Sequence, residues 1–215
     1  MRIALIHAVT VAMAPVHAAF AQRWPEAEVT DLLDTALAPD RERDGELTPA
    51  MCRRIIGLAD YAGGTGAAGI LFTCSAFGDA IEMAARSSAI PVLKPNQAMF
   101  EAALAAGTRI GMLATFGPSV AGMEAEFRDL AARRKSATRL ESVCIPEAMA
   151  ALRAGDGAAH DRLLADAAPA LAGCDAVLLA HFSTARAERA VSAALSCPVL
   201  TAPGAAVDKL KSLVA

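Results

Sequence analysis

The chain has 215 residues, a formal net charge of −3 at pH 7 and 55% hydrophobic residues, which is enough apolar material for one large or two small buried cores. Only 4% of the residues are aromatic, so small aliphatic side chains must fill those cores. The slightly acidic charge without a Lys/Arg-rich run excludes a nucleic-acid-binding surface, and no run of 18 uncharged apolar residues predicts a membrane span.

Short apolar runs alternate along the chain with longer segments rich in Ala, Leu, Glu and Arg, a pattern typical of parallel strands covered by helices. The predicted strands are residues 2–7, 27–33, 69–73, 91–93, 109–114, 139–145, 176–180 and 198–201. The predicted helices are residues 11–23, 48–62, 77–87, 97–106, 118–133, 147–153, 157–172, 184–195 and 204–213. Residues 38–46 carry six charges with Pro39 and Gly45, and predict a polar loop that could cover a site. The predicted fold class is α/β.

Three pairs of segments match each other at one offset of 107 residues. Their residue ranges are 2–7 with 109–114, 69–74 with 176–181, and 91–93 with 198–200. This internal repeat predicts two pseudo-symmetric domains, each a small parallel sheet flanked by helices. The first domain is expected to comprise residues 1–96 plus 204–215, and the second residues 97–203. Since open parallel sheets bind ligands at the carboxyl ends of their strands, we expect a site in the cleft between the domains.

The first 22 residues imitate a secretory signal, because a basic start precedes an apolar run and small residues. Residues 2–7, however, match an internal segment at 109–114, so we interpret them as the first strand of a folded domain. Five cysteines without a C-x-x-C pair favour a reducing compartment over a disulfide framework. The sequence therefore predicts a cytoplasmic protein.

Cys74 follows an apolar strand and precedes a predicted helix, which places the thiol at a strand-to-helix turn. Unpaired N–H groups at a helix amino end lower the pKa of a thiol, so we expect Cys74 to act as a thiolate base. The alternative is a buried cysteine that only fills space. That packing role is our interpretation of the other four cysteines, Cys52, Cys144, Cys174 and Cys197.

His181 occupies the matching turn of the second half and is followed by hydroxyl side chains. A histidine there can exchange a proton near neutral pH, although a lone histidine is usually structural. His7, at the end of the first strand, is a second candidate for contact with a ligand. We interpret His17 and His160, in helical segments, as surface residues. No spacing of His, Cys, Asp and Glu predicts a metal site.

Further turn residues can bind a small carboxylate through hydroxyl and backbone N–H groups, or can simply cap helices. They are Thr10, Thr73, Ser75, Thr115, Phe116, Ser119, Phe182, Ser183 and Thr184. Lys94 ends the strand at 91–93 and is either a positive charge for an anionic substrate or a surface lysine. The segment 64–69 matches G-x-G-x-x-G but precedes a strand, so we interpret it as a helix stop and turn rather than a dinucleotide site.

Together with the repeat and the P-V-L strand, the segment 71–78 (LFTCSAFG) resembles the aspartate/glutamate racemase superfamily, which includes hydantoin racemase, maleate isomerase and arylmalonate decarboxylase. The resemblance covers almost the whole chain. It implies two facing cysteines that act without metal or pyridoxal phosphate, and Cys74 matches the first. Where the family usually has a G-C-T turn, this chain has His181 in place of the second cysteine.

The resemblance implies a cofactor-independent racemase or isomerase acting on a small carboxylate, amino-acid-like or hydantoin-like. Cys74 would transfer the proton, with His181 as partner. Because inversion needs two bases on opposite faces of a carbanion, a one-base decarboxylase or a maleate-type cis-trans isomerase is the enzymatic alternative. A non-catalytic protein that binds small anions is a further alternative. Because members of this family form dimers or larger assemblies, the resemblance also implies a homo-oligomer.

Overall fold

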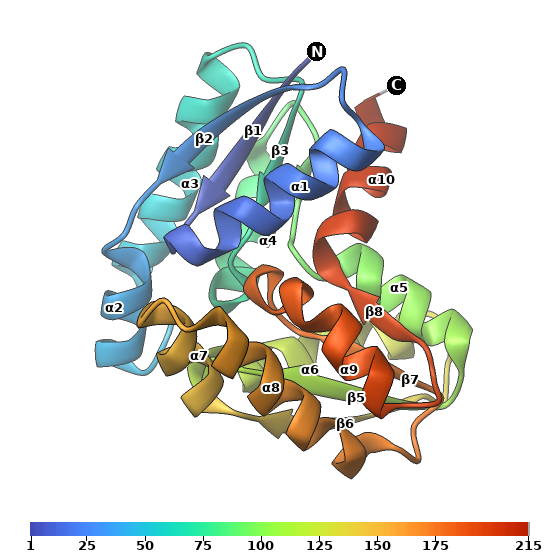
Figure 1. Ribbon diagram of the computed structural model, residues 1–215. Helices are drawn as coiled ribbons and strands as arrows, with labels where there is room; N and C mark the ends of the chain where they lie inside the picture. Colours follow the sequence, from blue (N-terminus) through green and yellow to red (C-terminus); the bar gives the residue numbers. More distant parts are fainter. Residues whose placement is uncertain (215) are drawn as a thin grey trace. The chain divides into compact units, whose positions relative to one another are not determined.

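The computed structural model describes residues 1–214 and shows that the chain divides into two compact units. Unit 1 comprises Met1–Gln97 and the chain from Pro203 onward, and unit 2 comprises Ala98–Ala202. Figure 1 colours the chain from its amino end to its carboxyl end, so that the first and last segments of unit 1 appear in blue and red.

The core of unit 1 is a four-stranded parallel sheet in the order β2-β1-β3-β4. Its strands are β1 (Arg2–His7), β2 (Glu28–Leu33), β3 (Gly69–Phe72) and β4 (Val92–Leu93). The two central strands are apolar along almost their whole length and are buried, as expected for strands that helices cover on both faces. The carboxyl ends of β1 and β3 therefore lie side by side, with Ile6 opposite Phe72.

Helices cover both faces of this sheet. They are η1 (Thr10–Ala12), α1 (Met13–Arg23), α2 (Leu37–Asp44), α3 (Pro49–Gly64), η2 (Ser75–Phe77), α4 (Gly78–Ser87) and α10 (Ala202–Val214). In Figure 1, α1 lies on one face with the returning helix α10, and α3 lies on the other. Helix α10 packs so closely on β3 that a Cβ atom added at Gly69 would lie 3.0 Å from Leu210 Cδ1. The last helix is therefore part of the core of unit 1.

The polar loop predicted at residues 38–46 is wrong, because most of this segment forms helix α2. Leu37 and Ala38, in the first turn of the helix, are buried, and Arg54 of α3 forms an ion pair with the Asp40 carboxylate at 2.6 Å. The helix ends at Gly45, whose φ of 70° is readily adopted by glycine. High charge concealed the helix, since only Leu37 and Ala38 of its eight residues are buried and form no long apolar stripe.

Unit 2 contains a second four-stranded parallel sheet, in the order β6-β5-β7-β8. Its strands are β5 (Arg109–Ala114), β6 (Arg139–Cys144), β7 (Ala176–Leu179) and β8 (Val199–Thr201). Ile3 pairs with Gly69 in unit 1, and Ile110 pairs with Ala176 in unit 2, so both partners differ by 107 positions. The two four-stranded parallel sheets flanked by helices confirm the predicted α/β class.

The helices of unit 2 are α5 (Gln97–Ala106), α6 (Gly117–Arg133), α7 (Pro146–Arg153), α8 (Gly157–Ala167), η3 (Ala168–Leu171), η4 (Phe182–Ala187) and α9 (Glu188–Ala194). Phe100 of α5 and Phe127 of α6 pack edge to face with ring centroids 5.4 Å apart. Leu164 and Val191 join Leu113 in a separate buried cluster beneath α8 and α9. None of the helices described within residues 1–214 is both long and apolar enough to cross a membrane.

Candidate active-site turns

Cys74 lies where β3 ends and the short helix η2 begins, and its backbone is extended. The Cys74 residue is partly exposed, yet protein atoms around the sulfur desolvate the thiolate, and this raises the pKa of the thiol to about 11. The backbone N–H of Ala76 and the positive charge of Arg41 lower the pKa, but by less than burial raises it. The expected lowered pKa is therefore wrong, since desolvation of the thiolate outweighs the partial charge at a single short turn.

Arg41 contacts this turn, and nothing in the sequence indicated that it would. It lies on α2, and its Nε donates to the Ala76 carbonyl oxygen at 3.3 Å. This bond directs a permanent positive charge toward Cys74 and favours the thiolate form. The sequence signal for Arg41 was weak, because the residue is one of six charges in a segment that we predicted to be a loop.

His7 and Thr73 link the carboxyl ends of β1 and β3, beside Cys74. His7 Nδ1 lies 2.8 Å from Thr73 Oγ1, and His7 Nε2 lies 2.9 Å from Asp31 Oδ1. A carboxylate can only accept, so Nε2 carries the hydrogen and Nδ1 accepts from the Thr73 hydroxyl. Burial lowers the pKa of His7, which agrees with a neutral ring, although Asp31 opposes this shift.

Asp31, on β2, is a second residue that the sequence analysis missed. Besides His7, its carboxylate accepts from His17 Nε2, at 2.9 and 3.0 Å to the two oxygens. The His17 side chain is partly exposed, so its predicted surface position agrees with the structure. The Asp31 carboxylate therefore accepts hydrogen bonds from the imidazoles of both His7 and His17. A lone acid within an alternating strand gave no sequence signal for this role.

His181 lies at the amino end of η4, directly after β7, and its ring is almost fully buried. The Phe116 backbone N–H donates to His181 Nε2 at 3.3 Å, and the His181 backbone N–H donates to the Thr184 hydroxyl at 3.2 Å. Burial lowers the pKa of His181 to about 4, with a smaller contribution from His160. At neutral pH this imidazole is therefore uncharged, with Nε2 as an acceptor.

Several of the small polar residues named as candidates lie in or next to the His181 turn. Thr115 directly follows β5, and its buried hydroxyl has no hydrogen-bond partner within the described chain. The Ser119 hydroxyl donates to the Phe116 carbonyl at 2.8 Å and so fixes the first turn of α6. Ser183 and Phe182 are buried in η4. The turn thus contains one polar side chain that is buried without a partner.

His160 is fully buried on α8, so its predicted surface position is wrong. Its Nδ1 lies 2.8 Å from the Asp161 carboxylate, which Arg186 of η4 also bonds at 2.8 Å. His160 Nε2 is buried and has no partner among residues 1–214. Its positive charge, when present, disfavours a charge on His181. The amphipathic pattern of α8 could not reveal that η4 packs over this position.

The remaining predicted residues lie in varied surroundings. Thr10 is exposed in η1, and Ser75 is partly exposed beside Cys74. Lys94 is buried and pairs with Glu82, so it is not a surface lysine. Gly66, with φ at 81°, lies in the turn between α3 and β3, which confirms the helix stop in the G-x-G-x-x-G segment.

The other four cysteines, interpreted as packing residues, divide into three groups. Cys174 is buried in the core of unit 2, with Cys197 packed against it. Cys52 is partly exposed on α3, and Cys144 is exposed, so the packing role of Cys144 is wrong. Within residues 1–214, no group of three or more His, Cys, Asp or Glu side chains is arranged to hold a metal ion.

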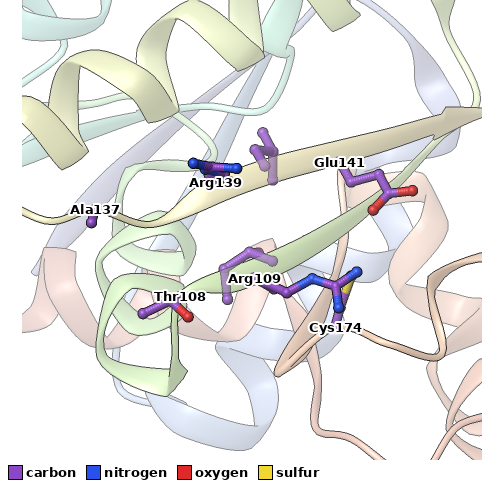
Figure 2. Close-up of a pocket in the computed structure, with 8 residues that line it drawn as sticks. Thr108, Arg109, Ala137, Arg139, Glu141 and Cys174 are labelled. Carbon is purple, nitrogen blue, oxygen red and sulfur yellow. The ribbon is translucent and has the colours of Figure 1, made fainter.

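A cavity of about 510 Å³ lies at the opposite end of the unit 2 sheet, where β5 and β6 begin. Figure 2 shows Arg109 extending toward Cys174, with the Glu141 carboxylate nearby and Arg139 on the neighbouring strand. The complete lining comprises Thr108, Arg109, Ile110, Ala137, Arg139, Leu140, Glu141 and Cys174. No sequence motif marked these residues, because they come from strand starts and loops.

Solved structures share this fold. An allantoin racemase from Klebsiella pneumoniae has a TM-score of 0.75 at 18% identity, over 100% of this chain and 87% of that one. A glutamate racemase isoform from Bacillus anthracis has a TM-score of 0.78 at 12% identity, over 99% and 80%. A mutant arylmalonate decarboxylase has a TM-score of 0.66 at 19% identity, over 100% and 93%. These low identities support a common fold alone.

A sequence comparison with curated proteins gives no match. The family model described as Asp/Glu/Hydantoin racemase, by contrast, matches residues 7–141. That segment is more than half of the chain, and it contains Cys74 with most of the surrounding turn. The predicted family resemblance is therefore confirmed, and the chain belongs to the Asp/Glu/hydantoin racemase family.

Proposed function

We propose that the protein is a cofactor-independent racemase or isomerase that moves a proton at the carbon next to a carboxyl group of a small organic acid. The acid is amino-acid-like or hydantoin-like. Cys74 is the proposed thiol acid and base, and His181 is the proposed partner in place of a second cysteine. The proposal requires both groups to reach one carbon of the substrate.

One observation carries this proposal. Cys74 and His181 follow the third strands of two sheets whose central pairings differ by 107 positions, and their own numbers differ by the same 107. Each sits at the carboxyl end of its sheet, where parallel sheets bind ligands. Two proton-transfer groups at equivalent positions suit a reaction that removes a proton from one face of a carbon and returns one to the other.

The protonation states support a division of roles. With a pKa of about 11, Cys74 carries its thiol proton at neutral pH, whereas His181, with a pKa of about 4, is a neutral imidazole with one protonated and one unprotonated ring nitrogen. One group can therefore donate while the other accepts. In the forward direction His181 Nε2 takes the substrate proton, which replaces the hydrogen bond from the Phe116 N–H, and the thiol gives its own proton. The reverse reaction starts from the resulting thiolate and imidazolium and exchanges these roles.

The intermediate of such a reaction is an enediolate, whose added negative charge needs oriented hydrogen-bond donors. The Thr115 hydroxyl, which is buried without a partner among residues 1–214, is one such donor, next to the Phe116 N–H that bonds His181. Arg41 supplies a positive charge in the Cys74 turn. In comparable oxyanion sites one donor contributes about 3 to 4 kcal/mol to transition-state stabilisation.

Deuterium labelling tests the two-base proposal. Purified protein is incubated in D₂O with each enantiomer of candidate amino acids and hydantoins, and solvent deuterium in both enantiomers is measured by NMR and chiral chromatography. We expect label in both enantiomers for wild type, and loss of interconversion in Cys74→Ala. A Cys74→Ala protein with full activity would contradict the proposal, and Cys52→Ala serves as the matched control.

The His181→Gln variant separates the two enzymatic hypotheses. A two-base racemase loses inversion in this variant, because one face of the carbon has no acid or base. A one-base decarboxylase or cis-trans isomerase keeps much of its turnover and labels one face only. The structural similarity to an arylmalonate decarboxylase makes this second hypothesis worth testing with arylmalonates and maleate.

A non-catalytic anion-binding protein predicts a different set of results. Small carboxylates would raise its melting temperature, but no candidate acid would exchange deuterium.

The cysteines bear on the location of the protein. All five are free thiols, which supports our proposal that the protein resides in the reducing cytoplasm.

A further inference from the structure

The cavity at the start of β5 and β6 has a size suited to a small molecule. It lies at the amino ends of these strands, whereas His181 follows the carboxyl end of β7, so the two sites occupy opposite ends of the same sheet. The proposed reaction does not use the cavity. Its charged lining therefore needs a separate explanation.

Two arginines stand directly opposite each other in this cavity, since Arg109 of β5 pairs with Arg139 of β6. Like charges on neighbouring strands repel each other, and water and salt screen this repulsion where the side chains are exposed. Both arginines are exposed, and within residues 1–214 neither guanidinium forms an ion pair with a carboxylate. The nearby Asp175 carboxylate accepts from the backbone N–H groups of Thr108 and Arg109, at 2.7 and 2.8 Å, and these bonds, with a smaller effect of the Arg109 charge, lower its pKa.

The equivalent place in unit 1 is arranged differently. Arg2 occupies the position of Arg109, and its partner across the strands is Glu28 rather than an arginine. Glu28 Oε1 accepts from Arg2 Nε at 3.0 Å and from Nη2 at 2.7 Å. In unit 1 a carboxylate of the chain thus neutralises the guanidinium. In unit 2 a second positive charge replaces that carboxylate, and a cavity adjoins it.

We propose that the cavity binds the carboxylate group of a small α-amino acid, which takes the role that the Glu28 side chain has in unit 1. Guanidinium groups recognise carboxylates through two parallel hydrogen bonds, and Arg109 and Arg139 both line the cavity. A bound carboxylate would relieve the repulsion between the two arginines.

Glu141 narrows the choice of ligand. Its carboxylate lines the same cavity, two residues along β6 from Arg139, so both side chains face the same side of the sheet. This negative charge disfavours a dianion and favours a ligand with a positive group beside its carboxylate. Cys174 adds a small uncharged surface, because burial raises the pKa of its thiol. An α-amino acid has this combination of charges.

An NMR titration of the full-length protein tests the site without reference to catalysis. L-Alanine and propionate, which lacks only the amino group, are each titrated into ¹⁵N-labelled protein. We expect L-alanine to shift the backbone amides around Arg109, Glu141 and Cys174 in a saturable way. Propionate should bind there on the order of tenfold more weakly, because it cannot contact Glu141 through an ammonium group. Binding at the catalytic turns would shift amides near Cys74 or His181 instead.

Three variants complete the test. Arg139→Glu recreates the Arg–Glu pair of unit 1, so it should abolish the shifts around Arg109 and raise the melting temperature by about 1 to 4 °C. Arg189→Glu makes the same charge change on the exposed face of α9 and should leave the titration unaltered. Glu141→Gln should remove the preference for L-alanine over propionate.

Several results would overturn the proposal. The site is rejected if L-alanine does not shift these amides, or if Arg139→Glu and wild type titrate alike. The assignment to an amino acid is rejected if propionate binds as well as L-alanine, or if Glu141→Gln keeps the preference. Failure of the racemase proposal would leave these outcomes unchanged, since none of them measures turnover.

Discussion

His7 Nδ1 accepts from the Thr73 hydroxyl at 2.8 Å, and this bond ties the end of β1 to the residue before Cys74. The same ring donates to Asp31, so one buried imidazole connects three strands of unit 1. The position of the thiol is thus determined by a polar network as well as by packing.

Replacing Thr73 with valine tests this network. Valine keeps the shape but leaves His7 Nδ1 buried without a partner, which costs about 1 to 3 kcal/mol of the free energy of unfolding. Urea denaturation measures the change. Thr30→Val is the matched control, because it removes a hydroxyl that donates to a backbone carbonyl at 3.3 Å in the same sheet. Equal destabilisation by the two variants would contradict a special role for the His7 bond.

The alkylation rate of Cys74 should depend steeply on pH. Because the thiolate reacts and the pKa of Cys74 is about 11, the rate with iodoacetamide should rise about tenfold per pH unit from pH 8 to pH 10. Mass spectrometry of the Cys74 peptide gives the rate at each pH. A small free thiol with an ordinary pKa serves as reference and should level off earlier. A plateau for Cys74 below pH 9 would disprove the raised pKa.

Arg41→Met should slow that alkylation further. The substitution removes the positive charge that favours the thiolate, so the pKa of Cys74 rises and its rate at pH 9 falls, by roughly 2- to 10-fold. Arg43→Met is the control, since Arg43 lies on the same helix but pairs with Asp40 and Asp44. If both variants react at the wild-type rate, Arg41 does not act on the thiol.

His181 should make the protein sensitive to acid. Its pKa is lowered from 6.5 to about 4 in the folded state, so the unfolded chain binds more protons between these values. The stabilisation is complete above pH 6.5 and is lost as the pH falls toward 4, by about 3 kcal/mol. Urea denaturation at pH 7 and pH 4 measures this loss.

His181→Gln is the comparison for that measurement, because glutamine can accept from the Phe116 N–H but does not titrate. The variant should lose less stability than wild type between pH 7 and pH 4. His7, whose pKa is also lowered, remains in both proteins and contributes equally. Identical pH dependence in the two proteins would show that His181 titrates normally.

The positions of Cys74 and His181 could be predicted because strand ends follow directly from local sequence. An uninterrupted apolar run must be buried on both faces, and the offset of 107 identified two such runs as equivalent. The predicted bounds of the eight strands differ from the structure by one residue or less at each end. Local patterning was sufficient here because the pairing of buried parallel strands depends mainly on their own residues.

The polar environment of these turns could not be predicted. Arg41, Asp31 and His160 act through tertiary contacts with residues that are distant in sequence, and no spacing rule connects them. The pKa of Cys74 was also predicted in the wrong direction. The backbone N–H groups of the turn can be inferred from local sequence, but the burial that raises the pKa depends on residues that are distant in sequence. His160 illustrates the same limit, since its surface character was inferred from one helix without knowledge of what covers it.

The return of α10 to β3 has a consequence for biosynthesis. Unit 2 is one uninterrupted stretch of chain, so all of its strands have left the ribosome before α10 emerges. Unit 1, although translated first, lacks the helix that covers Gly69 until residues 202–214 are made. The sheet of unit 1 therefore keeps one apolar face partly uncovered during synthesis until α10 has been translated, although its other elements are already complete.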